Sequence, residues 1–331
     1  MKVSTKSKSL EHNWNWHLKN AVRDPNRLAS ELEISLGDFK SDFPLLVPFP
    51  YLNRIQKGDL NDPLLLQVLP KVEEEKEVSG YILDPLKEQK PTNLPKGLIQ
   101  KYRRRALIIA AAACGINCRY CFRRHFPYDQ SRLDQQKWQD LLEHVSLDKT
   151  LREIIFSGGD PLILPDKFLE NLILRLNEIK HINTIRIHTR LPVVIPNRIN
   201  PGLISWAKKC RKKLVFVFHV NHPNEINDEV REYISKIKLS NTVLLNQSVL
   251  LKGVNNRSKV LASLSEKLFE AGVLPYYLHL LDPIKGTSHF FVSASEGMKI
   301  IEDLKGHLPG YLVPRLAQEI PGLDSKKTFF C

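Results

Sequence analysis

The sequence predicts an α/β protein whose core is a curved, partial (βα)6 barrel with an N-terminal region wrapped around it. Its 331 residues, 42% of them hydrophobic, suit a globular protein large enough for one barrel plus an appendage. From Arg105 onward, short β-branched runs alternate with amphipathic stretches, which is typical of a parallel sheet. Polar or reactive residues follow each predicted strand, as expected where parallel strands end at one edge.

The elements can be assigned in chain order. A short helix is expected at residues 28–35, followed by proline-rich, irregular chain up to about residue 100. The six predicted strands are 107–112, 153–156, 184–187, 214–218, 242–245 and 275–281. The helices that follow them are expected at 133–144, 166–179, 201–210, 227–237, 258–271 and 294–305, and a further extended piece at 311–316. We therefore expect a wrapping region (1–100), a barrel core (101–310) and a C-terminal segment (311–331).

Composition excludes several classes of protein. No run of about 18 apolar residues occurs, so no membrane span is expected. Residues 1–14 lack the apolar stretch of a secretory signal, and the cytoplasm is the expected location. The formal net charge of +13 would attract phosphates, acidic proteins or nucleic acid. The basic residues are spread along the chain, however, and a solvated basic surface explains them equally simply.

Three of the five cysteines, Cys114, Cys118 and Cys121, fall within eight positions. Their spacing differs from that of zinc-finger pairs. Thiolates are the ligands of iron–sulfur clusters, and three of them would leave one iron of a [4Fe–4S] cluster open to an outside ligand. Alternatively, Cys210 or Cys331 supplies a fourth ligand, which would make the protein an electron carrier or a structural iron–sulfur protein.

The cysteine spacing, directly after the first barrel strand, resembles the radical S-adenosylmethionine (SAM) superfamily, in which SAM binds the open iron. Ser157, Gly158, Gly159 and Asp160 are similar to the glycine-rich turn that this superfamily places against the SAM amino group. The resemblance implies a radical SAM-type barrel and reductive cleavage of SAM, with an electron donor such as flavodoxin or ferredoxin. Taken alone, the turn is equally a strand-to-helix connection that needs positive φ and a helix cap.

Longer segments resemble the lysine 2,3-aminomutase family. They are residues 60–69, 118–125, 190–198 and 219–225. The short form of the chain is most similar to the bacterial branch that makes (R)-β-lysine for modification of elongation factor P. Longer members carry a C-terminal extension with zinc-binding cysteines, which this sequence does not contain, so their large oligomer is not expected here.

The family resemblance implies pyridoxal phosphate (PLP) as a second cofactor, and PLP needs a lysine. It places that lysine at Lys326, with the neighbouring Lys327 or a merely basic tail as the alternatives. It also implies that Arg105 binds the PLP phosphate, a role suited to a fixed guanidinium. The positions that match SAM contacts of the family are Ser157, His219 and Gln247, in addition to the glycine-rich turn.

A site for L-lysine needs an arginine at the carboxylate and acids at the ε-ammonium. By the same resemblance Arg123 binds the carboxylate, and Asp282 and Glu319 hold the ammonium, Glu319 standing where the family usually has Asp. Simpler alternatives are that Arg123 is solvated, that Asp282 caps a turn before Pro283, and that Glu319 is a surface carboxylate.

The implied activity is that of an isomerase, in which a 2,3-amino migration converts L-α-lysine into (R)-β-lysine. Two other hypotheses remain: a radical SAM enzyme that modifies RNA, favoured by the charge but without an evident RNA-binding module, and the electron-transfer protein.

Overall fold

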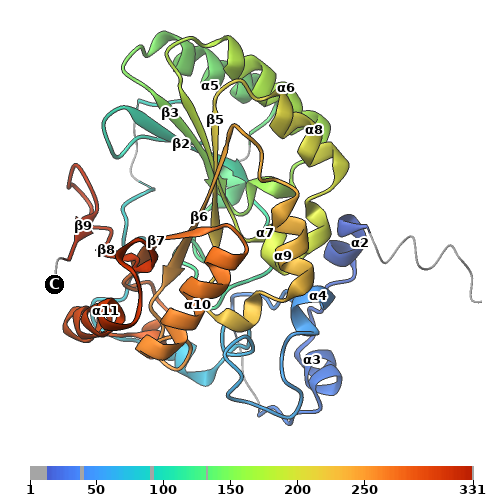
Figure 1. Cartoon of the computed structure of the whole chain (residues 1–331), viewed down its shortest axis with the longest axis vertical. Coiled ribbons are helices and arrows are strands. Elements are labelled where there is room, and N and C mark those ends of the chain that lie inside the picture. The colour runs from blue at the N-terminus through green and yellow to red at the C-terminus, as the bar shows by residue number, and fades with distance from the viewer. Residues whose placement is uncertain (1–12, 38–40, 90–92, 132, 330–331) are drawn as a thin grey trace, which may run out of the picture.

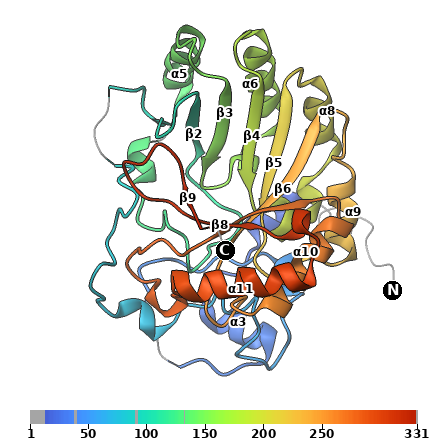
Figure 2. The same cartoon turned by 60° about the vertical axis from the view of Figure 1, so that its left-hand side comes forward.

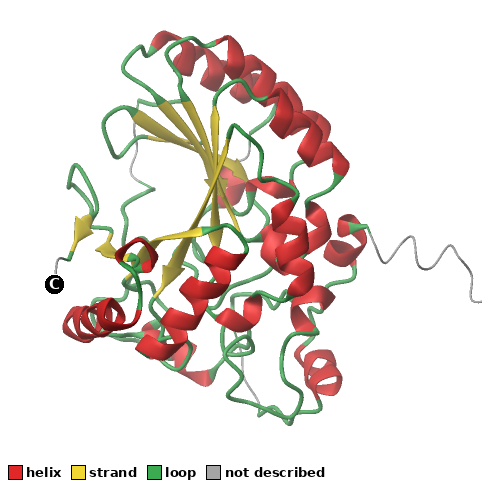
Figure 3. Ribbon diagram, in the orientation of Figure 1, coloured by secondary structure: helices red, strands yellow, loops and turns green. Residues whose placement is uncertain are grey.

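The computed structural model describes residues 13–37, 41–89, 93–131 and 133–329. Figure 1 shows a curved sheet with helices along its outer side, and Figure 3 shows that the strands form an open fan. In the described part of the chain the sheet has nine strands in the order β1 to β9. Their bounds are β1 Leu98–Ile99, β2 Arg105–Ala111, β3 Glu153–Gly158, β4 Thr184–Thr189, β5 Lys213–His219, β6 Thr242–Val249, β7 Leu274–His279, β8 Arg315–Gln318 and β9 Lys327–Thr328.

The strands β2 to β8 are parallel, and only the edge strands β1 and β9 are antiparallel to their neighbours. Each parallel strand pairs with the next one in sequence, so the barrel is built from consecutive βα units. Since β2 and β8 each pair outward with an edge strand and not with each other, the barrel is open. The partial barrel and its six predicted strands are thereby confirmed, with β8 as a seventh parallel strand.

Five of the six predicted strands are longer than predicted, and three of them thereby include predicted SAM-contact residues. The strand expected at 242–245 continues to Val249, and Gln247 lies within β6 rather than after it. Ser157 and His219 likewise belong to the last residues of β3 and β5. The ladder pairs His219 with Gln247 and Ile109 with Ser157, which places these side chains side by side on neighbouring strands.

The helices of the βα units lie outside the sheet, as Figure 2 shows for α5, α6 and α8. Their bounds are α5 Gln135–Leu147, α6 Asp166–Glu178, α8 Pro201–Lys209, α9 Asp228–Ser235, α10 Ser258–Glu270 and α11 Ala294–His307. Short polar side chains cap several of them; Asn200, Asn227 and Ser293 each accept a hydrogen bond from a backbone N–H of the first turn. No helix among the described residues is long and apolar enough to cross a membrane.

In its described residues the N-terminal region has three short α-helices, α2 Trp14–Lys19, α3 Pro25–Leu32 and α4 Phe49–Leu52, and one 3-10 helix, Val72–Glu75. The helix expected at 28–35 is misplaced by about one turn. Asp24 caps α3, Pro25 occupies its first position, and Glu33, with φ 56°, ends it.

This region is attached to the barrel at several points. Ile82 pairs with Ile284 in an isolated bridge, and the guanidinium of Arg54 donates to the backbone oxygens of Val193, at 2.6 Å, and of Glu225.

The extended piece expected at 311–316 is also misplaced. Gly310–Leu312 forms a 3-10 turn, and β8 starts only at Arg315, because proline at positions 309 and 314 confines the chain to a turn. Beyond β8 the chain reverses, and β9 returns antiparallel with Lys327 opposite Gln318. This return brings the C-terminal lysines back over the open end of the barrel.

Candidate active site

A cavity of about 480 Å³ lies inside the barrel, along the inner face of the sheet and at the carboxyl ends of its strands. Every site residue that the sequence predicts lines it. They are Arg105, Cys114, Cys118, Cys121, Arg123, Ser157, Gly158, Gly159, Asp160, His219, Gln247, Asp282, Glu319 and Lys326. Residues from position 105 to position 326 therefore share one cavity, as expected for the functional end of a βα barrel.

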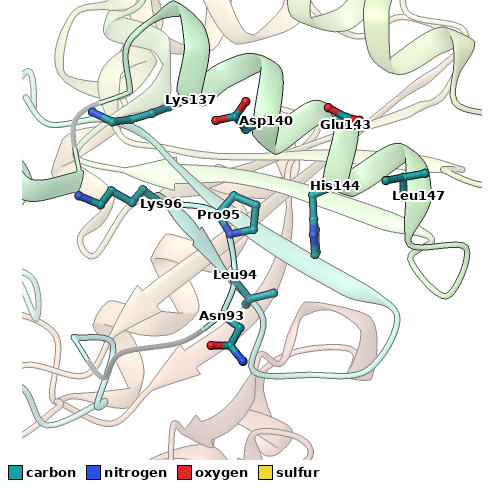
Figure 4. Close-up of a pocket in the computed structure, with 9 residues that line it drawn as sticks. All are labelled: Asn93, Leu94, Pro95, Lys96, Lys137, Asp140, Glu143, His144 and Leu147. Atoms are coloured by element: carbon teal, nitrogen blue, oxygen red, sulfur yellow. The ribbon is translucent and has the colours of Figure 1, made fainter.

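A larger hollow of about 600 Å³ lies elsewhere, and Figure 4 shows its lining. One side is the exposed face of α5, with Asp140, Glu143 and Leu147, and the other is the loop at residues 93–96. This hollow is shallow, polar and remote from the strand ends, and no predicted site residue lines it. Despite its size, it is not the candidate site.

The three cysteines lie on the loop between β2 and α5, and none forms a disulfide. Burial raises the pKa of Cys114, and it raises the pKa of Cys121 to about 11, so both thiols need a positive ligand before they ionise. The described residues include no group of three His, Cys, Asp or Glu arranged around one metal ion. A cluster does not require one, because each thiolate binds a different iron.

Arg190, a residue to which the sequence assigned no role, donates a hydrogen bond from NH1 to the Cys118 sulfur at 2.7 Å. Its NH2 group donates to Gln67 Oε1 at 2.7 Å and to Glu225 Oε2 at 2.8 Å. A fixed cation at this sulfur offsets the charge of a cluster thiolate. The N-terminal region thus supports the cysteine loop through Gln67.

A fourth protein ligand from Cys210 does not fit the structure. Cys210 caps the C-terminal end of α8, where its thiol is buried and donates to the Lys212 carbonyl at 3.5 Å. It does not line the cavity. Cys331 lies outside the described residues.

The glycine-rich turn packs directly on the backbone that precedes Cys114. The N–H of Gly159 donates to the Ala111 carbonyl at 2.7 Å, and the N–H of Asp160 donates to the Ala113 carbonyl at 2.8 Å. A Cβ on Gly159 would overlap the Ala113 carbonyl, and Gly158 has φ +116°. The two glycines are therefore required by a close approach and by a left-handed backbone.

Asp160 is fully engaged by the protein. Its carboxylate accepts hydrogen bonds from Thr189 Oγ1 at 2.8 Å and from the backbone N–H groups of Leu162, Arg190 and Leu191 at 2.8 to 3.0 Å. The side chain thus caps one helix and joins β3 to β4. Any contact of Asp160 with SAM would therefore come from its backbone groups.

His219 lies at the end of β5 and is neutral, because burial lowers its pKa to about 3. The Tyr120 hydroxyl lies 2.8 Å from its Nε2, and the two rings stack with centroids 5.5 Å apart. This histidine is held in one orientation, as a ligand-contacting side chain requires.

Lys326 and Lys327 point in opposite directions, as successive side chains of extended chain do. Lys326 lines the cavity and forms an ion pair with Glu319, which also accepts a hydrogen bond from the Tyr102 hydroxyl at 2.6 Å. Lys327 is exposed, with its Nζ 5.2 Å from the ring of Phe329. The geometry therefore favours Lys326 as the cofactor lysine, and Glu319 is not a surface carboxylate.

Arg105 lies at the start of β2, with its guanidinium carbon 4.6 Å from the Tyr102 ring centroid. Its buried Nε has no hydrogen-bond partner among the described residues. A buried N–H donor normally has a hydrogen-bond acceptor, and a phosphate oxygen bound in the cavity would supply one for Arg105.

Two further predicted residues, Asp282 and Arg123, are charged groups that line the cavity. Burial raises the pKa of Asp282 to about 7, and a cation bound beside this carboxyl would stabilise its ionised form. Arg123 is not solvated; it is 5% exposed and ion-paired with Glu88. Sequence reasoning missed Glu88, Lys101 and Tyr102, which also line the cavity. The basic run at 101–105 was a signal for Lys101 and Tyr102, whereas Glu88 had none.

The fold and the site together define a class of protein. A partial barrel with three cysteines after its first parallel strand and a glycine-rich turn after the second is the arrangement of radical SAM proteins. In agreement, residues 108–244 match the family model of the Radical SAM superfamily.

Comparison of the full sequence defines the family more narrowly. The chain is 45% identical to L-lysine 2,3-aminomutase of Haemophilus influenzae over 96% of each chain, and 42% identical to that of Escherichia coli over 98% of this chain and 96% of the relative. It is 33% identical to L-lysine 2,3-aminomutase of Clostridium subterminale over 95% of this chain and 77% of the relative. The chain belongs to the lysine 2,3-aminomutase family. The members of this family are isomerases, and they use a [4Fe–4S] cluster, SAM and PLP.

Proposed function

We propose that this protein converts L-α-lysine into (R)-β-lysine by 2,3-amino migration. The observation that carries the proposal is the single cavity, which brings together three thiols, a lysine beside a carboxylate, an unpaired arginine nitrogen and charged groups for both ends of lysine. An electron carrier needs none of these groups except the thiols.

The cofactors would be held by residues that line this one cavity. Cys114, Cys118 and Cys121 hold the cluster, the backbone of residues 157–160 together with His219 and Gln247 holds SAM, and Lys326 and Arg105 hold PLP. When bound, cluster and SAM supply a radical that removes a hydrogen atom from the substrate, and PLP supplies the conjugated system through which the amino group migrates.

The substrate is held by its charges. Arg123 binds the α-carboxylate, and Asp282 and Glu319 bind the ε-ammonium. The apolar walls between them, which include Leu107, Ile155 and Val249, line the same cavity and exclude water from the reaction.

The proposed cellular setting rests on the resemblance to the short bacterial branch of the family. The similarity over nearly the whole length to the Haemophilus and Escherichia enzymes supports assignment to the short bacterial branch. We therefore propose that the product serves the modification of elongation factor P in the cytoplasm, and that flavodoxin or ferredoxin reduces the cluster. The comparisons give no support to the RNA-modifying alternative, and we do not propose it.

The test is an anaerobic assay of the reconstituted protein with SAM, PLP, dithionite and L-lysine, followed by chromatography with mass detection. We expect β-lysine and 5′-deoxyadenosine to form together. Formation of 5′-deoxyadenosine without β-lysine would keep the radical SAM class but overturn the substrate. Formation of neither by protein with an intact cluster would favour the electron-transfer hypothesis.

A further inference from the structure

Glu88 is a buried carboxylate at the cavity that the proposed function does not use. It belongs to the N-terminal region, its side chain is 4% exposed, and it lines the cavity. Its two oxygens accept hydrogen bonds from Arg123, from Nε at 2.7 Å and from NH2 at 3.0 Å. Such a two-point ion pair fixes the plane of the guanidinium.

The ion pair occupies only one edge of the guanidinium. Arginine has five N–H donors, of which Glu88 takes two on the Nε edge. NH1 donates to Ser157 Oγ at 3.0 Å, on the side of the glycine-rich turn. The donors that remain on NH1 and NH2 form the opposite edge, which has the geometry to receive a second carboxylate. Glu88 can thus stay in place while Arg123 binds a ligand.

Lys101 connects Glu88 with the other end of the site. Its ammonium lies 3.0 Å from Glu88 Oε1 and 3.7 Å from Glu319 Oε1. The backbone N–H groups of Glu88 and Gln89 are themselves held by the Asp84 carboxylate at 3.0 Å each, which fixes the turn that carries Glu88. A continuous series of charges therefore joins Arg123 to the carboxylate that would hold the ε-ammonium.

Loss of the Glu88 charge would affect both ends. Arg123 would lose the carboxylate that fixes its plane, and its free edge would no longer be directed. Lys101 would keep Glu319 as its remaining carboxylate partner and would compete there with the ammonium of a substrate. Both effects weaken binding of a ligand with a free carboxylate and an ammonium.

We propose that Glu88 is the positioning residue for the substrate carboxylate: by holding one edge of Arg123 it directs the other edge to the substrate, and through Lys101 it keeps Glu319 available. This inference rests on the proposed function. It implies that the site selects a free amino acid, with its carboxylate charged, over a lysyl group whose carboxyl is tied in an amide.

The test measures binding without turnover, on the holoenzyme loaded with cluster, SAM and PLP but left unreduced. Equilibrium dialysis with radiolabelled L-lysine, with and without L-lysinamide as competitor, gives Kd for both ligands. Glu88→Gln is expected to weaken lysine binding roughly tenfold and lysinamide binding only about two- to threefold, because lysinamide has the ammonium but no carboxylate and is affected only at Glu319. Equal losses for both ligands, or no loss for lysine, would overturn the proposal.

Glu88→Asp keeps the charge but withdraws it by one methylene, which breaks the two-point contact. If Glu88→Gln does not fold, Glu88→Asp should show the same selective loss for lysine, and an equal effect on both ligands contradicts the proposal. Lys101→Met in the Glu88→Gln protein should restore part of the lysine affinity, because it removes the competitor for Glu319. A further loss of lysine affinity would overturn the proposed link through Lys101.

Asp166→Asn is the matched control, since the half-buried Asp166 forms an ion pair with the buried Arg198 at 2.8 Å, and neither residue lines the cavity. It should lower stability without changing the ratio of the two Kd values. Wild-type holoenzyme that binds no lysine would overturn the proposed function itself. If the wild-type holoenzyme binds lysine but the ratio of the two Kd values is the same in both Glu88 variants as in the wild type, only the proposed role of Glu88 is overturned.

Discussion

At the scale of single residues, the charge state of the cavity depends on pH through Asp282. Burial raises the pKa of this carboxyl to about 7, above its ordinary value, so the protonated form persists up to neutral pH. Only the ionised form attracts an ammonium. Lysine binding should therefore weaken as pH falls below about 7, approaching tenfold per unit.

The measurement is the Kd of lysine for the unreduced holoenzyme as a function of pH. Asp282→Asn should bind lysine weakly at neutral pH and lose the slope, because no proton is then exchanged at this position. Glu77→Gln, a change at an exposed carboxylate paired with Lys285, should leave the slope unchanged. A slope that survives Asp282→Asn would assign the pH dependence to another group.

Lys326 provides a second prediction at this scale. Because its side chain lies in the cavity and that of Lys327 does not, Lys326→Ala should abolish covalent attachment of PLP, and Lys327→Ala should preserve it. Borohydride reduction followed by peptide mass analysis identifies the modified lysine. The iron content should be equal in both variants. A label on Lys327 in the wild-type protein would contradict the assignment.

At the scale of elements, the contact between the glycine-rich turn and the cysteine loop limits what the chain tolerates. Gly159→Ala should push the turn away from Ala113, lower the unfolding midpoint and weaken SAM binding; steric overpacking of this kind costs about 1–3 kcal/mol. Calorimetry and dialysis with labelled SAM measure the two effects.

Gly306→Ala is the control for that substitution, since a Cβ at this position in α11 would meet open space. It should leave SAM binding unchanged and raise stability by about 0.5–1 kcal/mol, because alanine is the better helix former. Equal effects of both alanines would show that the contact with Ala113 carries no special constraint.

The elements also show which parts of the structure sequence patterns can predict. The parallel strands and outer helices lie close to their expected positions, because buried β-branched runs and amphipathic stretches are local properties. The C-terminal extended piece was misplaced because two prolines, 309 and 314, outweigh its apolar pattern. Cys114, Cys118, Cys121 and Lys326 could be predicted as site residues from their spacing and from family resemblance, and the structure brings them to one cavity. Glu88 and Arg190 were missed because their roles depend on partners far away in sequence, for which no local pattern exists.

At the scale of the whole molecule, the N-terminal region is joined to the barrel by a shared apolar core and by buried polar contacts, among them those of Arg54. Arg54→Ala would leave the Val193 and Glu225 carbonyls without this donor, at a cost of about 1–3 kcal/mol each. We expect faster hydrogen exchange in residues 41–89, with β4 and β5 unchanged. This local response would show that the region can open separately from the barrel.

Arg23→Ala is the matched control. Arg23 also donates to three carbonyls, but all belong to its own segment, at Leu18, Lys19 and Ala21. Its loss should accelerate exchange only around α2. Uniform acceleration over the whole chain in Arg54→Ala would instead mean that region and barrel unfold as one unit.

The bridge between Ile82 and Ile284 has a consequence for protein synthesis. The partner of Ile82 leaves the ribosome about 200 residues later, which at 5–20 residues per second is roughly 10–40 s. During that time the apolar face of the N-terminal segment, including Leu64 and Leu65, has no barrel to cover it. The first part of the chain to be made therefore completes its contacts only after most of the barrel has been synthesised, and during that interval its exposed apolar surface is a site for chaperone binding or for aggregation.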